Sequence, residues 1–463
     1  MAETAPAAPR PSAATQAEPA LFLFFAFQEA LDGGDEPRLT NLLQTADAAD
    51  AAKAIALLDA AARAKLVELA GEQMRAPLLV ELEDAPRAEI LTLLPPAHVG
   101  AALQELPSDD AVFVLEALPP AARRKYLRRL AAPERRTLQA ALKFPENSAG
   151  RLMQADIVTA RSFWTVGRLI DYFRKAKNLP QEFLEIYVVD AKNRPIGVVR
   201  VHEVLRRARG IKLAALMDKA PRLIPATMDR EEVANRFRDY SLVAAAVVDK
   251  AERLVGVITA DDVLDVVHEE AGEDILRLGG VGGDAALSVS VWQAAGGRLG
   301  WLLVNLATAI LASWVISLFG ATLQQMVALA ILMPIVASMG GNAGTQTLTV
   351  AVRALATHNL VSVNALRVIW REAGIGLING IGLALIAALV GWLWFASPGL
   401  GWLLLAAMLV NMLTAALAGI LVPLGLQRAG VDPAIASVVL VTTVTDVVGF
   451  VVFLGLASLF LVG

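Results

Sequence analysis

The sequence predicts a multidomain membrane protein with a helical, superhelical N-terminal domain, a tandem α/β repeat, a connecting acidic helix and five transmembrane helices. Three observations lead to this fold class. The 463 residues are 56% hydrophobic with a mean hydropathy of +0.55, more than the core of a soluble protein requires. Only five of the 41 Lys and Arg residues and three of the 45 acids follow residue 284. A strand-rich motif occurs twice, 59 residues apart.

The C-terminal part, 285–463, contains the predicted membrane helices. Residues 299–352 and 373–427 carry no charged side chain, so each stretch can hold two spans joined by a tight hairpin, and 433–463 can hold a fifth. The predicted helices cover about 298–319, 322–352, 366–396, 400–427 and 433–461. The five arginines of this part lie at span ends on one side, which predicts a cytoplasmic N-terminal half and a C-terminus on the opposite side.

The N-terminal 143 residues predict a tail followed by short helices. Residues 1–20 are rich in Ala and Pro and are expected to be a disordered tail. In 21–143, the pairs Leu94-Pro95, Leu106-Pro107 and Leu118-Pro119 recur every 12 residues. Because proline is tolerated in the first turn of a helix, this spacing predicts short stacked helices in a superhelical array.

Residues 144–260 contain the tandem repeat. The segments Ile186–Asp190 and Gly197–Val199 recur as Ala245–Asp249 and Gly256–Ile258, which predicts two βαββα units. This arrangement resembles a tandem CBS module, whose repeats pack about a pseudo-twofold axis with clefts that can hold a nucleotide or an ion. A ligand-free interaction scaffold is the alternative.

Residues 261–284 are predicted to form the connecting helix. Seven acids and no Lys or Arg occur within 261–274. On a helix, four of these acids share one face, where like charges repel one another: Asp262, Asp265, Glu269 and Glu273. Bound cations would relieve this repulsion, so the segment is a candidate cation sensor. A solvated acidic helix face is the alternative.

The candidate ion path centres on Asp446, the one ionisable residue deep inside a predicted span. An aspartate there costs roughly 2.5–3.5 kcal/mol on insertion scales, which favours a role in ion or proton passage; a structural role, with the carboxylate capped by neighbouring threonines, is the alternative. Asn342 and Gln346, four residues apart in the second span, could offer amide oxygens to a hydrated ion, or could join helices. A homodimer would place two Asp446 carboxylates across its axis.

Composition and motifs also exclude several functions. Without cysteine there is no disulfide, Cys-ligated zinc or iron–sulfur site. A net charge of −4 offers no basic field for nucleic acid. No phosphate-binding loop or hydrolytic triad is evident, so we expect no enzyme activity.

The chain resembles the MgtE family of magnesium channels along nearly its whole length. The motifs that carry the resemblance are Phe144-Pro-Glu-Asn-Ser-Ala-Gly-Arg-Leu-Met153, the acidic segment 261–274, Gly340-Gly-Asn-Ala-Gly-Thr-Gln346, Arg353-Ala-Leu-Ala-Thr357, Val431-Asp-Pro-Ala434 and Thr445-Asp-Val-Val-Gly449. The resemblance implies a homodimer in the bacterial inner membrane, with a pore lined by the second and fifth spans. It also implies that cytosolic Mg²⁺ bridges acids of the connecting helix, the CBS pair and the N domain and closes the pore.

Site residues follow from this resemblance. Asp446 matches the pore aspartate, and Asn342 lies in the Gly-Asn motif, with Gln346 one turn later. The positions that match regulatory Mg²⁺ ligands are Glu231, Asp262, Asp265, Glu270, Glu273 and Asp274.

The chain departs from the family pattern at several positions. Ala101, Pro133 and Ser241 stand where acids would face the connecting helix, so we expect weaker or altered magnesium gating. Val438-Val439 stands upstream of Asp446 where the family often has Asn-Pro or Gly-Pro, so a polar pore group there is lost and ion selectivity could differ. Glu185 stands where an aromatic residue is expected at the CBS cleft, and ATP binding is left open.

The sequence therefore predicts passive, gradient-driven magnesium uptake. A channel for Co²⁺, Mn²⁺ or Ca²⁺ is the alternative within transport, because these hydrated ions present similar charge. A non-conducting membrane receptor that uses its CBS pair to report ligand occupancy is the alternative from another class.

Overall fold

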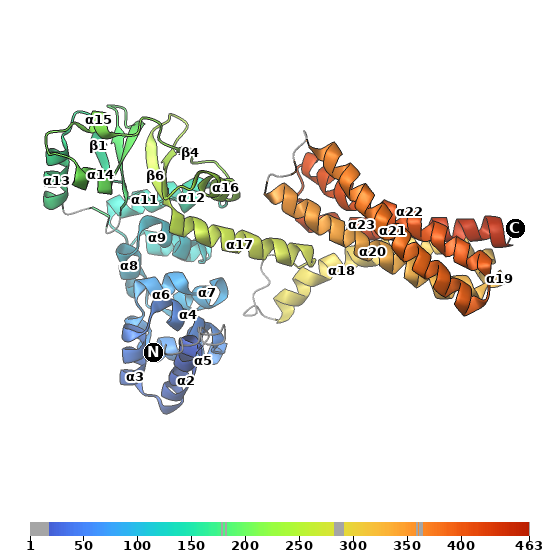
Figure 1. The fold of residues 1–463 in the computed structure, drawn as a ribbon. Helices are drawn as coiled ribbons and strands as arrows, with labels where there is room; N and C mark the ends of the chain where they lie inside the picture. Colours follow the sequence, from blue (N-terminus) through green and yellow to red (C-terminus); the bar gives the residue numbers. More distant parts are fainter. Residues whose placement is uncertain are drawn as a thin grey trace, which may run out of the picture. The chain divides into compact units, whose positions relative to one another are not determined.

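A computed structural model describes residues 18–176, 179–180, 183–281, 291–357, 360 and 364–462 (Figure 1). The chain divides into two compact units, Met1–Glu269 and Glu270–Gly463. Helix α17 (Ala260–Leu278) begins in the first unit and ends in the second.

The first unit opens with a stack of short helices. They are α2 (Glu18–Gly33), α3 (Glu36–Thr45), α4 (Ala48–Leu57), α5 (Ala60–Ala70), the 3₁₀ turn η1 (Gly71–Gln73), α6 (Ala76–Glu81), α7 (Asp84–Leu93), α8 (Pro96–Glu105), α9 (Ser108–Glu116), α10 (Pro120–Leu127) and α11 (Ala132–Ala141). Most of the tail predicted at 1–20 lies outside the described residues. Its last three residues belong to α2, where Ala20 is buried.

The leucine–proline pairs mark helix boundaries, as the spacing predicts. Pro95, Pro107 and Pro119 each occupy the N-cap of a helix, where the missing N–H costs no helical hydrogen bond. The leucine before each proline packs inward, and Leu94 and Leu118 are each 2% exposed. The repeat therefore supplies both the helix starts and part of the core.

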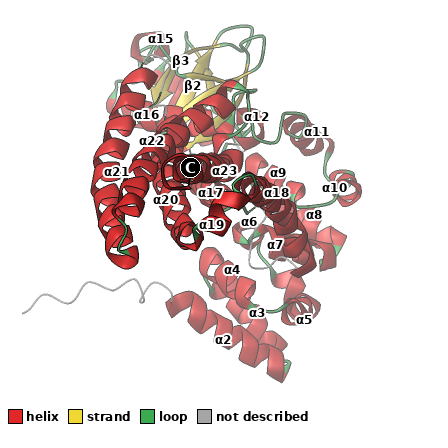
Figure 2. Ribbon diagram, turned by 90° about the vertical axis from the view of Figure 1, so that its right-hand side faces the viewer, coloured by secondary structure: helices red, strands yellow, loops and turns green. Residues whose placement is uncertain are grey.

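Two three-stranded sheets follow, and Figure 2 shows that the strands gather in this part of the chain. The first repeat contains α12 (Ala149–Leu152), β1 (Thr159–Arg161), α13 (Val166–Lys175), β2 (Glu185–Val189), β3 (Pro195–Arg200) and α14 (Val201–Arg206). The second contains α15 (Leu213–Leu216), β4 (Leu223–Pro225), α16 (Arg230–Tyr240), β5 (Ala244–Val248), β6 (Leu254–Thr259) and the start of α17. In each sheet the first two strands are parallel and the last two antiparallel, with a register shift at the same position.

The two repeats exchange their opening segments. Gln154 pairs with Val257 of β6, and Asp218 pairs with Val198 of β3. A Cβ at Gly197 would lie 2.7 Å from the Met217 sulfur, and one at Gly256 would overlap Met153. Each repeat thus completes the core of the other, which fixes them as one body.

The second unit contains five long apolar helices. They are α18 (Val291–Ser317), α20 (Val327–Ala356), α21 (Ala365–Phe395), α22 (Pro398–Arg428) and α23 (Pro433–Ala457), with the short α19 (Gly320–Gln325) and a final π-helical turn (Ser458–Val462). All five are long and apolar enough to cross a membrane. The second begins at Val327 rather than at 322, because α19 occupies the hairpin before it.

Candidate functional site

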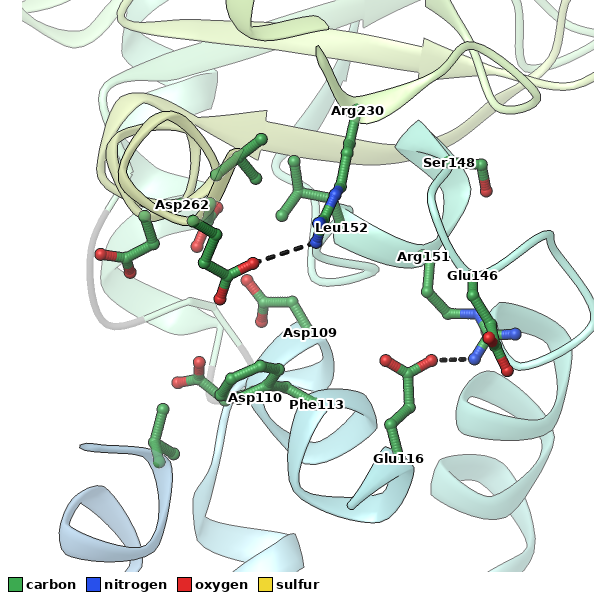
Figure 3. Close-up of a pocket in the computed structure, with 14 residues that line it drawn as sticks. Asp109, Asp110, Phe113, Glu116, Glu146, Ser148, Arg151, Leu152, Arg230 and Asp262 are labelled. Carbon is green, nitrogen blue, oxygen red and sulfur yellow. Dashed lines mark hydrogen bonds and ion pairs between the residues drawn. The ribbon is translucent and has the colours of Figure 1, made fainter. Parts of the chain in front are cut away.

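An acidic cavity of about 130 Å³ lies in the first unit, between α9 and the start of α17 (Figure 3). Its acids come from both helices and from the chain around α12. They are Asp109, Asp110, Glu116, Glu146, Asp262, Asp265 and Glu269. In this cavity, carboxylates of the helical N-terminal stack therefore lie near carboxylates of the connecting helix.

Asp109 lies deepest among these acids. Its residue is 8% exposed, and its Oδ1 has no hydrogen-bond partner in the described part of the chain. Burial raises the pKa of Asp109 well above its usual value, and the charges of Asp262 and Asp110 raise it further. Figure 3 shows the Asp109 carboxyl group pointing toward α17. A buried oxygen without a donor is a position that a cation can satisfy.

The pKa values of Asp110 and Asp262 are raised, as is that of Asp109. Burial raises the pKa of Asp110 to about 6, with further contributions from Asp262 and Glu81. Burial also raises the pKa of Asp262, although Thr259 donates a 2.6 Å hydrogen bond to its Oδ2. This bond fixes the carboxylate at the first turn of α17 and leaves the other oxygen available.

Arginines neutralise acids at the edge of the cavity, but not the acids at its centre. Arg230 pairs with Glu269 at 3.0 Å, and Arg151 pairs with Glu116. Within the described ranges, neither Asp109, Asp110 nor Asp262 forms an ion pair with a basic side chain. Each acid at the centre therefore faces other acids.

The donor set fits a hard cation, because magnesium prefers carboxylate oxygens and keeps part of its water shell. Over the part of the chain that is described, no group of three or more His, Cys, Asp or Glu side chains could hold a metal ion. A cation in this cavity would therefore have to bridge the acids through its water ligands.

The structure brings together two of the six predicted regulatory residues, Asp262 and Asp265, in this cavity. Glu231 lies in the first turn of α16 and does not line it. Glu270, Glu273 and Asp274 belong to the second unit.

Sequence reasoning missed Asp109 and Asp110. The available signal was the pair of acids directly after Ser108 at the start of a predicted helix. Where the family pattern leads us to expect acids, Ala101 and Pro133 are exposed, and Ser241 closes α16 in a left-handed conformation.

In the second unit, side-chain contacts attach the end of α17 to the membrane helices. Arg277 donates a 2.6 Å hydrogen bond to Asp432 and also pairs with Glu273. Asp432 caps α23 by accepting a 2.8 Å hydrogen bond from the Ala434 amide. Burial and the Asp432 charge raise the pKa of Asp274.

The candidate ion path lies along α20 and α23, which pack closely. A Cβ at Gly344 would lie 2.6 Å from Val441 Cγ1, and one at Gly341 would lie 3.8 Å from Thr442 Cγ2. Asp446 is half-buried one turn beyond Thr442. Small residues thus let the two backbones approach, as is typical of membrane helix pairs.

The predicted path residues have polar groups that the described chain leaves unpaired. Asn342 and Gln346 are exposed on one face of α20. Neither amide, nor the Asp446 carboxylate, forms a hydrogen bond with another described residue. These groups can therefore serve a hydrated ion or a second chain.

Family models match most of the chain in the order of its domains. An intracellular N domain model (MgtE_N) matches residues 46–147, CBS models match 149–210 and 213–269, and a divalent cation transporter model (MgtE) matches 333–456. A relative named magnesium transporter MgtE from Thermus thermophilus is 35% identical over 333 residues, which cover 71% of this chain and 73% of the relative. The chain belongs to the MgtE family.

A second relative agrees with the MgtE assignment. A relative of the same name from Bacillus subtilis is 30% identical over 72% of this chain and 74% of its own length. A solved structure of the cytosolic domain of the Mg²⁺ channel MgtE in complex with ATP is 31% identical over 52% of this chain and 99% of that chain, with a TM-score of 0.48.

Membership in the MgtE family confirms the fold class predicted from the sequence. The chain has a helical N domain, two CBS domains and five long apolar helices. It is a multi-pass membrane protein with an intracellular N domain, and its family is one of transporters, not enzymes.

Proposed function

We propose that two copies of this chain form a magnesium channel in the bacterial inner membrane. The observation that carries the proposal is Asp446, an acid within α23 at the glycine-lined contact with α20. The relatives named as magnesium transporters support the choice of ion. In this proposal the C-terminus lies opposite the cytoplasm, and residues 21–143, 144–260, 261–284 and 285–463 form the four functional parts.

Passive entry requires no energy source beyond the membrane potential. An inside-negative potential favours inward movement of a divalent ion by about 4.6 kcal/mol per 100 mV. Two Asp446 carboxylates, one from each chain, would offset the cost of bringing a hydrated divalent ion into the membrane. Asn342 and Gln346 would contact its water shell.

A channel for other divalent ions is the second candidate, because the matching family model is described as a divalent cation transporter. Hydrated Mg²⁺, Co²⁺ and Mn²⁺ carry the same charge, so Asp446 alone does not distinguish them. Competition between these ions during uptake decides between the two candidates.

The acidic cavity supports magnesium-dependent gating. A cation among Asp109, Asp110 and Asp262 would hold the N domain against the connecting helix. Its loss would leave three buried acids to repel one another. We therefore assign Asp109, Asp110, Asp262 and Asp265 to the sensor, in which a bound ion favours the closed channel. The predicted roles of Glu231, Glu270, Glu273 and Asp274 stay predictions.

Nucleotide binding by the CBS pair is a separate question. Glu185 begins β2, where the Tyr187 hydroxyl donates a 3.0 Å hydrogen bond to its carboxylate. A carboxylate there would repel phosphates and cannot stack on a base, so we expect weak ATP binding. Calorimetric titration with ATP measures it, and a micromolar Kd would contradict this expectation.

The first experiment compares the wild type with Asp446→Asn. Both are expressed in a magnesium-auxotrophic bacterial strain, and growth and magnesium uptake are measured. We expect rescue by the wild type alone, with both proteins present in the membrane at equal amounts. Equal rescue by Asp446→Asn would show that the acid serves packing, and rescue by neither would favour another ion or a receptor.

A further inference from the structure

Asn411 is a fully buried polar residue in the middle of α22, with an exposed fraction of 0%. Its Nδ2 donates a 2.8 Å hydrogen bond to the Val336 carbonyl of α20. Its Oδ1 has no hydrogen-bond partner within the described chain. Half of this carboxamide is therefore satisfied and half is not.

The carboxamide of Asn411 fills the space left by two glycines on neighbouring helices. A Cβ at Gly449 of α23 would lie 2.8 Å from Asn411 Nδ2, and one at Gly340 of α20 would overlap the same group. Asn411 thus contacts α20 and α23 at one level of the bundle. Its size sets how closely α22 approaches both helices.

This junction lies next to the groups assigned to the ion path. Gly340 precedes Asn342 by two residues, and Gly449 follows Asp446 by three. At 1.5 Å of rise per residue, these separations are about 3 Å and 4.5 Å along the helices. Any shift of either helix against Asn411 therefore moves the neighbouring path residue as well.

Packing alone does not explain an amide at this place. A buried polar atom without a partner is unfavourable, whereas an apolar side chain of similar volume would fill the same space without that cost. The hydrogen bond to Val336 supplies what leucine would lack, a fixed attachment of α22 to the backbone of α20.

We propose that Asn411 is a positioning residue that sets the separation of Asn342 and Asp446, and through it the affinity and selectivity of the path for divalent ions. This inference rests on the proposed function, in which α20 and α23 line the path. Asn411 acts through these helices and need not contact the ion.

The test uses the full-length protein in proteoliposomes, with Asn411→Leu as the main variant. We measure the KM and maximal rate of Mg²⁺ uptake, inhibition by Co²⁺, and the thermal midpoint in detergent. Asn411→Leu is expected to change the KM or the Mg²⁺/Co²⁺ preference by roughly threefold or more, with an unchanged or higher midpoint. A KM and a preference equal to those of the wild type would overturn the proposal.

Thr414→Val serves as the matched control, because Thr414 is a half-buried polar residue of the same helix whose hydroxyl, within the described chain, donates only to the Val410 carbonyl of α22. It should leave uptake and selectivity unchanged. Asp446→Asn is measured in parallel. If it transports like the wild type, the proposed path fails; if it is inactive and Asn411→Leu behaves as wild type, only the role of Asn411 fails.

A second set of variants keeps the proposal testable if Asn411→Leu does not fold. Gly340→Ala should clash with Asn411, and Asn411→Ala should relieve that clash in the double variant. We expect the double variant to recover the thermal midpoint but not the KM or the ion preference. Recovery of all three would show that Asn411 only fills space.

Discussion

Asp109 combines deep burial with an oxygen that no described residue satisfies, and its neighbours are acids. The charge of such a group opposes folding unless a cation accompanies it. Asp109→Asn should therefore stabilise the protein in chelator, by about 1 kcal/mol, and should reduce its stabilisation by Mg²⁺. Thermal unfolding with EDTA and with Mg²⁺ checks both effects.

The matched control for Asp109→Asn is Asp239→Asn, since Asp239 is an exposed acid of α16 that pairs with its neighbour Arg238. It should unfold like the wild type under both conditions. A full magnesium-dependent shift in Asp109→Asn would contradict the assignment of Asp109 to the sensor.

The raised pKa of Asp110 predicts that the stability of the protein depends on pH in the absence of metal. Its pKa is about 6 in the folded chain, against an ordinary value of 3.8, so the folded state binds its proton more tightly than the unfolded state does. The stabilisation that Asp110 contributes by binding its proton more tightly in the folded state is fully present below pH 3.8, and it is lost as the pH rises through about 6. Unfolding midpoints in EDTA should fall across this range, and the fall should be smaller in Asp110→Asn.

At the scale of elements, the end of α17 connects the proposed sensor to the membrane helices. Leu278 packs against a hydrophobic cluster that includes Leu348 of α20 and Val441 of α23. Gly280 adopts a φ of +70°, and a Cβ there would overlap Trp301, so glycine is required for this turn. Movement of α17 would therefore be passed directly to the helices of the proposed path.

Arg277→Gln tests this connection. The variant loses the ion pairs with Asp432 and Glu273, while Asp432 keeps its cap on α23. Because both partners are partly exposed, we expect a loss of stability of only about 0.5–1 kcal/mol. We also expect weaker inhibition of uptake by cytosolic Mg²⁺ at an unchanged maximal rate.

This inhibition is measured as uptake into proteoliposomes while the Mg²⁺ concentration on the side of the cytosolic domains is varied. Arg236→Gln is the control, because it removes an exposed pair with Glu232 within α16. If Arg277→Gln closes at the same magnesium concentration as the wild type, the ion pair has no part in gating.

At the scale of the whole molecule, the proposal requires two chains to share one path. Wild-type chains and Asp446→Asn chains expressed at equal amounts should pair at random, so about one quarter of the dimers contain two wild-type chains. If both carboxylates are needed, uptake should fall to about a quarter. A fall to only about half would mean that each chain conducts alone.

The sequence by itself determined the elements and their order. The charge-free stretches fix the membrane helices, because lipid admits few charges, and the leucine–proline pairs fix helix starts, because proline lacks an N–H. The repeat at an offset of 59 predicted the paired sheets, and the motifs identified the family. These features are local, so they can be read without knowing which segments meet.

The tertiary structure decided which side chains face one another. Asp109 and Asp110 lie more than 150 residues before Asp262, and only the fold, which places α9 and the start of α17 around one cavity, brings them together. The positioning role proposed for Asn411 likewise depends on its contacts with Gly340 and Gly449. The sequence does not show these contacts, because a single amide in an apolar helix does not reveal which residues it touches. Burial and long-range contact set the pKa of a carboxylate and the satisfaction of an amide, and neither is encoded in the residues beside them.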